Sequence, residues 1–353
     1  MARDAEAIVI GAGITGLATA HALARRGRDV LVLEQFQLGH ARGSSHGATR
    51  IFRLAYPEPE WIRLAQEALE GWRELEARSG TELLALVGLV ELVRDLSESA
   101  QRALASCGVE CRVLEASEAE TEFGLCVPEG FTALLQPDAG VVYAERAHAA
   151  LVHGLAVREG VRVTRIEDAG GRVNLETTEG PVEAGVAVVT AGSWARPLLA
   201  TAGISLDVET TRETVAYFEL STTDLLPAVA EFQTDARRHA FYALHDPEHG
   251  LKAGLNGSGG PTDPDREEDP DAAIVERIAA WVAERFPVAR PEAVHAQTCL
   301  YTNTPDESFV LERHSRVVVG SACSGHGFKF APVVGQRLAA LASEVLGTSA
   351  RRR

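Results

Sequence analysis

A glycine-rich turn near the N-terminus carries the first residues whose spacing suggests a chemistry. Gly11, Gly13 and Gly16 form a G-x-G-x-x-G pattern between the apolar residues 7–10 and a stretch with helical periodicity. Gly11 permits a tight turn, Gly13 lets the backbone approach a pyrophosphate, and Gly16 lets helix and strand pack closely. Glu34 ends the next apolar stretch, where it can accept hydrogen bonds from ribose hydroxyls. The pattern predicts a dinucleotide site at a helix N-terminus and does not distinguish FAD from NAD.

A lysine in the second half of the chain lies in the strand-like stretch HGLKAGLNG. With a period of two, the apolar Leu251, Ala253 and Leu255 point to one side, and Lys252 and Asn256 point to the other. The apolar side suits a protein core. The lysine side is therefore expected to line a site, and an exposed strand lysine is the alternative.

A cysteine and a tyrosine share one side of another expected strand, CLYTN. Cys299, Tyr301 and Asn303 alternate with apolar or small residues, so a thiol and a phenol can face one ligand. The alternative for the cysteine is the commonest role of a free thiol, that of a small buried hydrophobe.

A second lysine, Lys329, follows two glycines in the turn SGHGFKF near the C-terminus. Gly325 and Gly327 let the backbone pass close to a ligand. A lysine that is buried without an anion is costly, so its presence in a turn that is expected to be buried needs an explanation.

Four motifs, in register with the fingerprint, resemble those of one enzyme family. They are GSSHGATRIFR, GLKAG, CLYTNTPDE and SGHGFKF. Together they resemble the monomeric sarcosine oxidase and N-methyltryptophan oxidase family of FAD-dependent amine oxidases, over almost the whole chain. The resemblance implies FAD as the cofactor. It also implies covalent attachment of FAD through a cysteine thioether, which falls on Cys299.

The resemblance further implies roles for the charged residues. Lys252 matches the lysine that is implicated in oxygen activation, and Lys329 matches one that helps to bind the substrate carboxylate. Arg53 is expected to bind the same carboxylate, because a planar guanidinium can grip it with two hydrogen bonds. Arg50 is expected to hold the flavin and would share a face with Arg53 on a helix. The alternative for either arginine is a surface salt bridge.

One position departs from the family pattern. Sarcosine-oxidising members carry a histidine four residues after the lysine of GLK, whereas this chain has the uncharged Asn256. The identity of the substrate depends on this difference. Tyr242 and Tyr301 match the substrate-pocket tyrosines of the family, and an ordinary half-buried strand aromatic is the alternative.

These observations define a predicted site. The residues expected to act on the substrate or on dioxygen are Lys252, Arg53, Lys329, Tyr301, Tyr242 and Asn256. The residues expected to bind FAD are Gly11, Gly13, Ile14, Thr15, Gly16, Glu34, Ser45, His46, Thr49, Arg50, Cys299, Gly325, His326, Gly327, Phe328 and Lys329. No metal site is expected, because the CxxxC pair of Cys107 and Cys111 has no second ligand pair.

Strands alternate with helices at both ends of the chain, around a strand-rich middle. This order predicts an α/β (α+β) fold with a Rossmann-like FAD-binding domain, built from discontinuous segments, and a catalytic domain with a mixed β-sheet. The FAD-binding domain is expected to comprise residues 1–84, 143–206 and 306–353, and the substrate domain residues 85–142 and 207–305.

Five stretches are expected to be helical. Helical periodicity or a glycine stop marks residues 14–26, 61–75, 144–160, 274–286 and 333–346.

The composition limits the possible partners. The chain has 353 residues, of which 50 are acidic and 34 are Lys or Arg, for a net charge of −16. This balance argues against nucleic acid or an anionic membrane surface as a partner. Five irregularly spaced cysteines do not indicate a disulfide framework. With no leader pattern and no apolar run of membrane-spanning length, we expect a cytoplasmic monomer that takes a small amino acid and dioxygen.

The predicted activity is oxidation of a small secondary, N-methyl amino acid, which releases an aldehyde and hydrogen peroxide. An oxidase of a cyclic imino acid such as pipecolate or proline, or an FAD-dependent amino acid dehydrogenase, is the alternative within enzymes. A non-catalytic FAD-binding partner subunit is the alternative from another class. The joint presence of Lys252, Cys299 and Lys329 argues against it, because a passive module needs none of them.

Overall fold

The computed structural model describes residues 4–94, 98–232 and 240–350. Each of its two compact units is assembled from stretches that are far apart in the sequence. The first unit comprises Met1–His46, Glu145–Thr210 and Leu300–Arg353. The second unit comprises Gly47–Ala144 and Thr211–Cys299.

An eight-stranded mixed sheet forms the centre of the first unit, with the strand order β10-β11-β12-β1-β2-β9. Strand β19 pairs with β12, and β18 pairs with β19. The strands are β1 (Ala5–Ile10), β2 (Val30–Leu33), β9 (Ala156–Arg158), β10 (Val163–Asp168), β11 (Val173–Thr177), β12 (Gly180–Val189), β18 (Val310–His314) and β19 (Val317–Ser321). Strand β1 runs parallel to both β2 and β12, as the glycine fingerprint requires of a βαβ unit.

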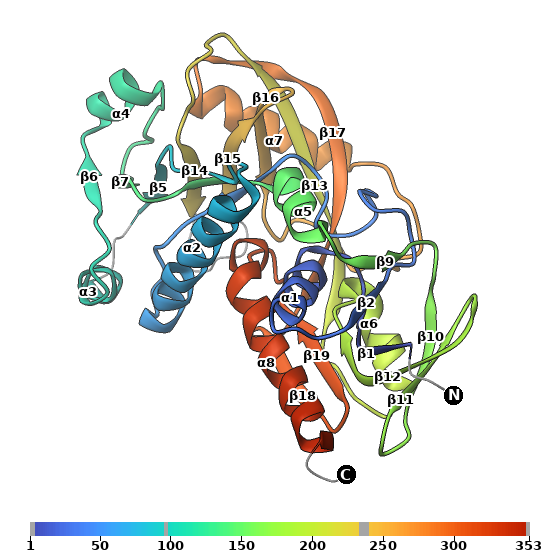
Figure 1. The fold of residues 1–353 in the computed structure, drawn as a ribbon. Coiled ribbons are helices and arrows are strands. Elements are labelled where there is room, and N and C mark those ends of the chain that lie inside the picture. Colours follow the sequence, from blue (N-terminus) through green and yellow to red (C-terminus); the bar gives the residue numbers. More distant parts are fainter. Residues whose placement is uncertain (1–3, 95–97, 233–239, 351–353) are drawn as a thin grey trace. The chain divides into compact units, whose positions relative to one another are not determined.

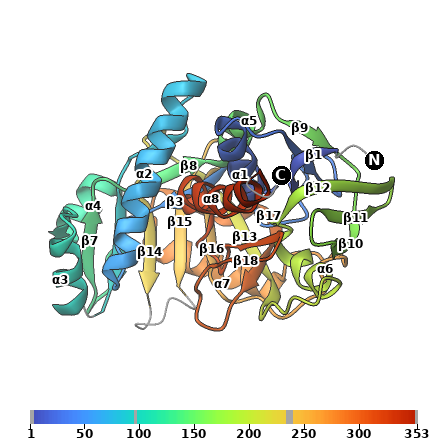
Figure 2. The same cartoon turned by 60° about the horizontal axis from the view of Figure 1, so that its bottom comes forward.

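Two helices of the first unit, α1 (Ile14–Arg25) and α8 (Ala331–Ala350), lie side by side (Figures 1 and 2). Gly335 of α8 permits this contact, because a Cβ there would lie 2.6 Å from the backbone carbon of Ala18. The unit also contains α5 (Ala144–Val152), α6 (Ala195–Ala200) and the 3₁₀ turns Gly192–Trp194 and Phe328–Phe330.

A second eight-stranded sheet forms the centre of the second unit, with the order β17-β13-β16-β15-β14-β5-β7-β6. Its strands are β5 (Leu89–Val93), β6 (Arg112–Leu114), β7 (Thr132–Gln136), β13 (Glu209–Leu220), β14 (Ala228–Phe232), β15 (Phe241–Asp246), β16 (Gly250–Leu255) and β17 (Ala289–Asn303). A three-stranded sheet joins β3 (Thr49–Phe52), β8 (Gly140–Tyr143) and β4 (Leu84–Ala85). The helices are α2 (Pro59–Ser79), α3 (Glu98–Ser106), α4 (Ala116–Phe123) and α7 (Ala272–Arg285).

The amphipathic helix α7 covers one face of this second sheet. Its buried residues Ile278 and Val282 belong to the same core cluster as Val90, Ala253 and Phe218 of the sheet. Asp271 begins the helix as its N-cap, and its side chain accepts hydrogen bonds from two backbone amides of the first turn. The opposite face carries Leu89, Ala228 and Leu244, which form a smaller core cluster with Ala139 of the loop before β8 and with Val141 of β8 itself.

The mixed α/β fold confirms the predicted class, and the structure corrects two local expectations. The helix expected over residues 144–160 ends at Val152, because Gly154 has a φ of 76° and the chain then enters β9. Arg50 lies in strand β3 rather than on a helix, so the helical face expected for Arg50 and Arg53 is wrong. Residues 47–84 belong to the second compact unit, and the assignment of segments to an FAD-binding and a substrate domain stays a prediction.

Among the described residues, every helix is too short or too polar to span a membrane.

Candidate cofactor and substrate site

The glycine fingerprint of the first unit has the geometry that its sequence predicts. Gly11 has a φ of 100°, and a Cβ there would lie 2.7 Å from the carbonyl oxygen of Thr190. A Cβ on Gly16 would lie 1.9 Å from the carbonyl oxygen of Gly11, so only glycine fits at this crossing of helix and turn.

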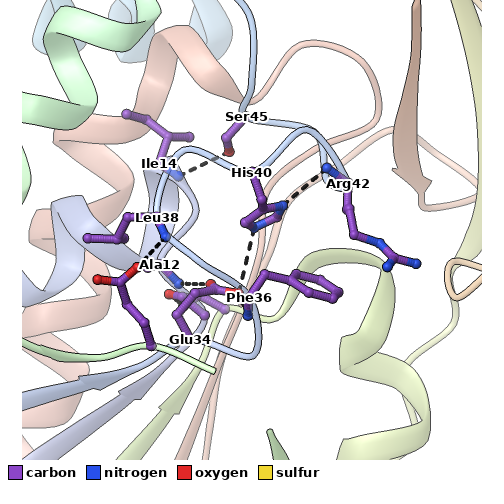
Figure 3. A network of polar contacts seen from close by, with 11 residues as sticks. Ala12, Ile14, Glu34, Phe36, Leu38, His40, Arg42 and Ser45 are labelled. Carbon is purple, nitrogen blue, oxygen red and sulfur yellow. Dashed lines mark hydrogen bonds and ion pairs between the residues drawn. The ribbon is translucent and has the colours of Figure 1, made fainter. Parts of the chain in front are cut away.

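Glu34 is buried at the end of β2 and ties the glycine turn to the strand (Figure 3). Its Oε2 accepts a hydrogen bond of 2.7 Å from the Ala12 amide, and its Oε1 accepts one of 3.0 Å from the Phe36 amide. The carboxylate keeps further lone pairs with which it can accept from a ribose hydroxyl.

The N-terminus of α1 offers its amide groups to an anion. Its N-cap residue Gly13 makes no side-chain cap, and its first turn, which includes Thr15, contains no acidic residue. The Ile14 amide donates a 3.1 Å hydrogen bond to Ser45 Oγ, which places Ser45 at this helix end (Figure 3). The glycine turn, the helix end without acidic residues and the buried acid Glu34 together fit the pyrophosphate and ribose of FAD.

The C-terminal motif of the first unit forms a compact turn before α8. A Cβ on Gly327 would lie 1.7 Å from the Ala322 carbonyl oxygen, and Gly325 has a φ of 72°. Lys329 is only 5% exposed, and its Nζ donates a 2.8 Å hydrogen bond to the His326 carbonyl oxygen. Lys329 is thus buried as predicted. Phe328 precedes it in the same 3₁₀ turn, and its ring lies 6.2 Å from that of His148.

The strand register of the second unit gathers several predicted residues on one face of its sheet. Glu91 pairs with Ala230, Ala230 with Tyr242, and Tyr242 with Gly254. Lys252, two residues before Gly254 on β16, pairs with Tyr217. Because directly opposed residues share a face, these side chains point away from the core that α7 covers. Tyr217, which the sequence analysis did not name, shares this face with Glu91, Tyr242 and Lys252.

Lys252 is buried on this face at 5% exposure. Its Nζ donates to the Thr49 carbonyl oxygen at 3.5 Å, and Arg50 Nη1 donates to the same oxygen at 2.8 Å. Burial, followed by the nearby charge of Arg50, lowers the pKa of Lys252 to about 7. The structure therefore brings Lys252, Arg50 and Thr49 together and excludes the exposed-lysine alternative.

Gly47 lies close to the side chains of both Lys252 and Arg50. A Cβ there would lie 3.6 Å from both Arg50 Nη1 and Lys252 Nζ, and 3.4 Å from Gln297 Nε2. Gln297 also donates to the Tyr217 hydroxyl. Gln297 precedes Cys299 by two residues, so the period of two along β17 could have identified it from the sequence.

The phenol ring of Tyr242 lies over its strand partner Gly254. A Cβ on Gly254 would lie 2.5 Å from the Tyr242 hydroxyl oxygen, so residue 254 must lack a side chain. Burial and the neighbouring Cys299 raise the pKa of Tyr242, so its hydroxyl is a stable hydrogen-bond donor. Asn256 lies directly after β16. Its backbone N–H donates a 2.9 Å hydrogen bond to the carbonyl oxygen of Ala240.

Cys299 and Tyr301 lie on one side of β17, as predicted from the period of two. Cys299 is the last residue of the second unit in this strand, and Tyr301 belongs to the first unit. The half-buried thiol of Cys299 is free of a disulfide. His46 likewise ends a segment of the first unit, directly before Gly47.

Arg53 is already paired within the second unit. Its Nη1 lies 2.9 Å from Glu91 Oε1, a residue that the sequence analysis did not single out. Burial opposes the charge of Arg53, but Tyr56 and Glu91 outweigh it and raise the arginine pKa. One signal was present in the sequence, because Glu91 is the single charged residue of the apolar strand LVELV.

Comparisons with known proteins identify the family of this chain. A family model described as FAD dependent oxidoreductase matches residues 6–341. The peroxisomal sarcosine oxidase of Homo sapiens is 36% identical, over 94% of this chain and 90% of that protein. The monomeric sarcosine oxidase of Bacillus sp. (strain B-0618) is 31% identical, over 97% of this chain and 93% of that protein.

A solved structure shares the fold over nearly the whole chain. NikD, an unusual amino acid oxidase essential for nikkomycin biosynthesis, superposes with a TM-score of 0.87 at 28% identity, over 97% of this chain and 95% of that chain. The resemblance inferred from the four motifs is confirmed by the family model and the relatives. The chain belongs to the family of FAD-dependent oxidoreductases.

Proposed function

We propose that the protein is an FAD-dependent oxidase of a small secondary amino acid, with an N-methyl amino acid as its substrate. Oxidation of the N-methyl carbon and hydrolysis of the resulting imine release an aldehyde, and reduction of dioxygen gives hydrogen peroxide. The observation that carries the proposal is buried Lys252, which shares a carbonyl oxygen with Arg50 on the face of the sheet opposite α7, in a chain whose relatives are called sarcosine oxidases.

Bound FAD supplies the redox chemistry, because it accepts a hydride equivalent from the carbon next to nitrogen and passes electrons to dioxygen. Lys252 supplies a positive charge close to where charge develops on dioxygen, and its burial makes that charge more effective. Thr49 contacts both Lys252 and Arg50 through one carbonyl oxygen, which fixes the positions of the two side chains.

The substrate is proposed to bind through its carboxylate and over aromatic side chains. Arg53 and Lys329 each keep the proposed role of a carboxylate ligand, and Tyr242 and Tyr301 that of pocket tyrosines. The amine binds unprotonated, since only a nitrogen with a free lone pair can assist loss of the hydride equivalent. Asn256, where a histidine stands in sarcosine-oxidising members of the family, is proposed to set the preferred substituent.

Peroxide release in air tests this function directly. The panel contains sarcosine, N-methyl-L-tryptophan, L-pipecolate, L-proline, glycine and D-alanine. We expect peroxide with at least one N-methyl amino acid. Peroxide only with the cyclic imino acids would favour the alternative substrate class, and bleaching of the flavin without peroxide would show a dehydrogenase.

The variant Lys252→Met separates the lysine from the rest of the chemistry. We expect unchanged flavin reduction by substrate under anaerobic conditions and flavin reoxidation by dioxygen slowed at least roughly a hundredfold. Reoxidation at the wild-type rate would contradict the role of Lys252.

Covalent attachment of FAD through Cys299 is a separate proposal, supported by the position of this half-buried cysteine on the same side of β17 as Tyr301. Acid precipitation of the wild type is expected to leave the yellow colour in the pellet. Precipitation of Cys299→Ser is expected to release it, and the matched variant Cys126→Ser should retain it. Complete release from the wild type would contradict the attachment.

A monomeric state and a cytoplasmic location complete the proposal. Size-exclusion chromatography with light scattering tests the first, and fractionation of the producing cells tests the second.

A further inference from the structure

Arg53, the arginine expected to bind the substrate carboxylate, is held by a carboxylate of the protein itself. The side chains of Arg53 and Glu91 are only 13% and 9% exposed. The guanidinium carbon also lies 4.6 Å from the Tyr56 ring centroid and 5.4 Å from that of Phe232. The arginine is therefore enclosed by one acid and two aromatic rings of the second unit.

Glu91 is buried on the face of the sheet that α7 does not cover. Its neighbours Val90 and Leu92 point into the core on the other face, in the cluster that α7 covers. Strand register places Glu91 on the same face as Tyr242 and Lys252. A buried carboxylate needs a partner, but a purely structural ion pair would not have to lie among these residues.

Gln136 on the adjacent strand β7 provides a second, independent observation. Its Oε1 accepts hydrogen bonds from the amides of Leu54 at 3.3 Å and Ala55 at 2.9 Å, the two residues that follow Arg53. Its Nε2 is fully buried and has no hydrogen-bond partner among the described residues. An unpaired buried donor costs about 1–3 kcal/mol, so an acceptor atom next to it, from an ordered water or from a ligand, is favoured.

The pair sets the charge that an incoming group meets. Without Glu91, Arg53 would present a full positive charge to a carboxylate. With Glu91 bound, the two charges cancel, and a carboxylate must share the guanidinium with Glu91 or displace it. A second carboxylate on the same substrate would meet Glu91 as a like charge.

We propose that Glu91 is a specificity-determining residue, which weakens the binding of anionic groups at Arg53 and so selects substrates with one carboxylate and an uncharged substituent. This inference rests on the proposed function, in which Arg53 binds the substrate carboxylate.

The variant Glu91→Gln tests the inference, because it keeps the shape of the side chain and removes its charge. The probes are 2-furoate, a carboxylate that is not an amine substrate, and 2-furamide, its neutral counterpart. Isothermal titration calorimetry on the holoenzyme gives both dissociation constants. We expect 2-furoate to bind about tenfold more tightly to Glu91→Gln than to the wild type, and 2-furamide to change less than about twofold.

Glu231→Gln is a matched control. Glu231 is a buried acid on the neighbouring strand β14, on the opposite face of the same sheet, and pairs with Arg285 at 2.6 Å. We expect this variant to melt at a lower temperature and to bind both probes like the wild type. If Glu91→Gln does not fold, Glu91→Asp replaces it, with a smaller gain in the same direction because the carboxylate retracts from Arg53.

The double variant Arg53→Met with Glu91→Gln distinguishes failure of the inference from failure of the proposed function. We expect it to lose the tighter binding of 2-furoate, because the arginine is gone. If it binds 2-furoate as tightly as Glu91→Gln does, Arg53 is not a carboxylate ligand and its role in the proposed function is wrong. If the double variant weakens binding but Glu91→Gln and Glu91→Asp do not strengthen it, Arg53 keeps its role and the inference about Glu91 is wrong.

Discussion

The charge state of a single residue in this chain depends on the groups that surround it as well as on its type. Lys252 and Lys329 are both only 5% exposed. The ammonium group of each donates a hydrogen bond to a backbone carbonyl oxygen. Arg50 next to Lys252 keeps a second positive charge close by, which a protein fold tolerates only at a cost. Such a cost is typical of a functional site.

The lowered pKa of Lys252 predicts a pH-dependent stability. Between pH 7 and the ordinary lysine pKa of 10.5 the unfolded chain binds more protons at this position than the folded chain, so stability rises with pH in that window. Lys252→Met removes the effect. The measured quantity is the free energy of unfolding of the variant minus that of the wild type, obtained from thermal melting. We expect this difference to be larger at pH 7 than at pH 10 by roughly 3 kcal/mol. Equal differences at the two pH values would show that Lys252 titrates normally.

Substitution of Gly16 is expected to reduce the FAD content of the protein. Gly16→Ala would place a Cβ 1.9 Å from the Gly11 carbonyl oxygen, so the glycine turn must move. We expect the ratio of FAD to protein, measured by absorbance, to fall well below that of the wild type. Gly347→Ala is the control for a glycine outside the fingerprint, since it lies in helix α8 and a Cβ there meets no atom within 4 Å. Normal FAD content in Gly16→Ala would contradict the assigned geometry.

At the scale of helices and strands, contacts between segments that are distant in the sequence determine how the elements pack, which local sequence patterns do not specify. Helix α8 from the C-terminus packs on α1 from the N-terminus, and β3 pairs with β8 far along the chain. The first contact needs glycine at residue 335, which sequence periodicity alone does not explain.

Two glycines of α8 give opposite predictions for the same substitution. Alanine stabilises an exposed helix position by up to about 1 kcal/mol relative to glycine. We expect that gain for Gly347→Ala, because a Cβ there meets no atom within 4 Å. Gly335→Ala places a Cβ 2.6 Å from the Ala18 backbone, and overpacking of about 1–3 kcal/mol should exceed the gain. Thermal melting of both variants checks the difference, and equal shifts would contradict the close packing of α1 and α8.

At the scale of the whole molecule, the charge balance governs behaviour in solution. A net charge of −16 at pH 7 keeps copies of the chain apart by repulsion.

The same charge balance predicts poor solubility in mild acid. The isoelectric point calculated from the sequence is about 5.2, where repulsion between copies vanishes. We expect the solubility, measured after ammonium sulfate precipitation across pH 4.5–8, to be lowest near that value. A minimum above pH 7 would show that folding masks many of the carboxylates.

The sequence alone determined the features that depend on residues close together in the chain. The spacing of Gly11, Gly13 and Gly16 predicted the βαβ turn, because each glycine acts within one turn of chain. The period of two around Lys252 and around Cys299 predicted which side chains share a side of their strands. The four motifs predicted the family, which the comparisons confirm.

Only the tertiary structure decided which distant residues meet. Arg50 and Arg53 lie three apart, a spacing that suits a helix, but pairing of β3 with β8 makes the segment a strand. Glu91 is 38 residues from Arg53, and their ion pair depends on the register of β5, which no local pattern encodes. The charge of the carboxylate subsite is thus set by tertiary pairing, because the free energy of a buried charge depends on what surrounds it.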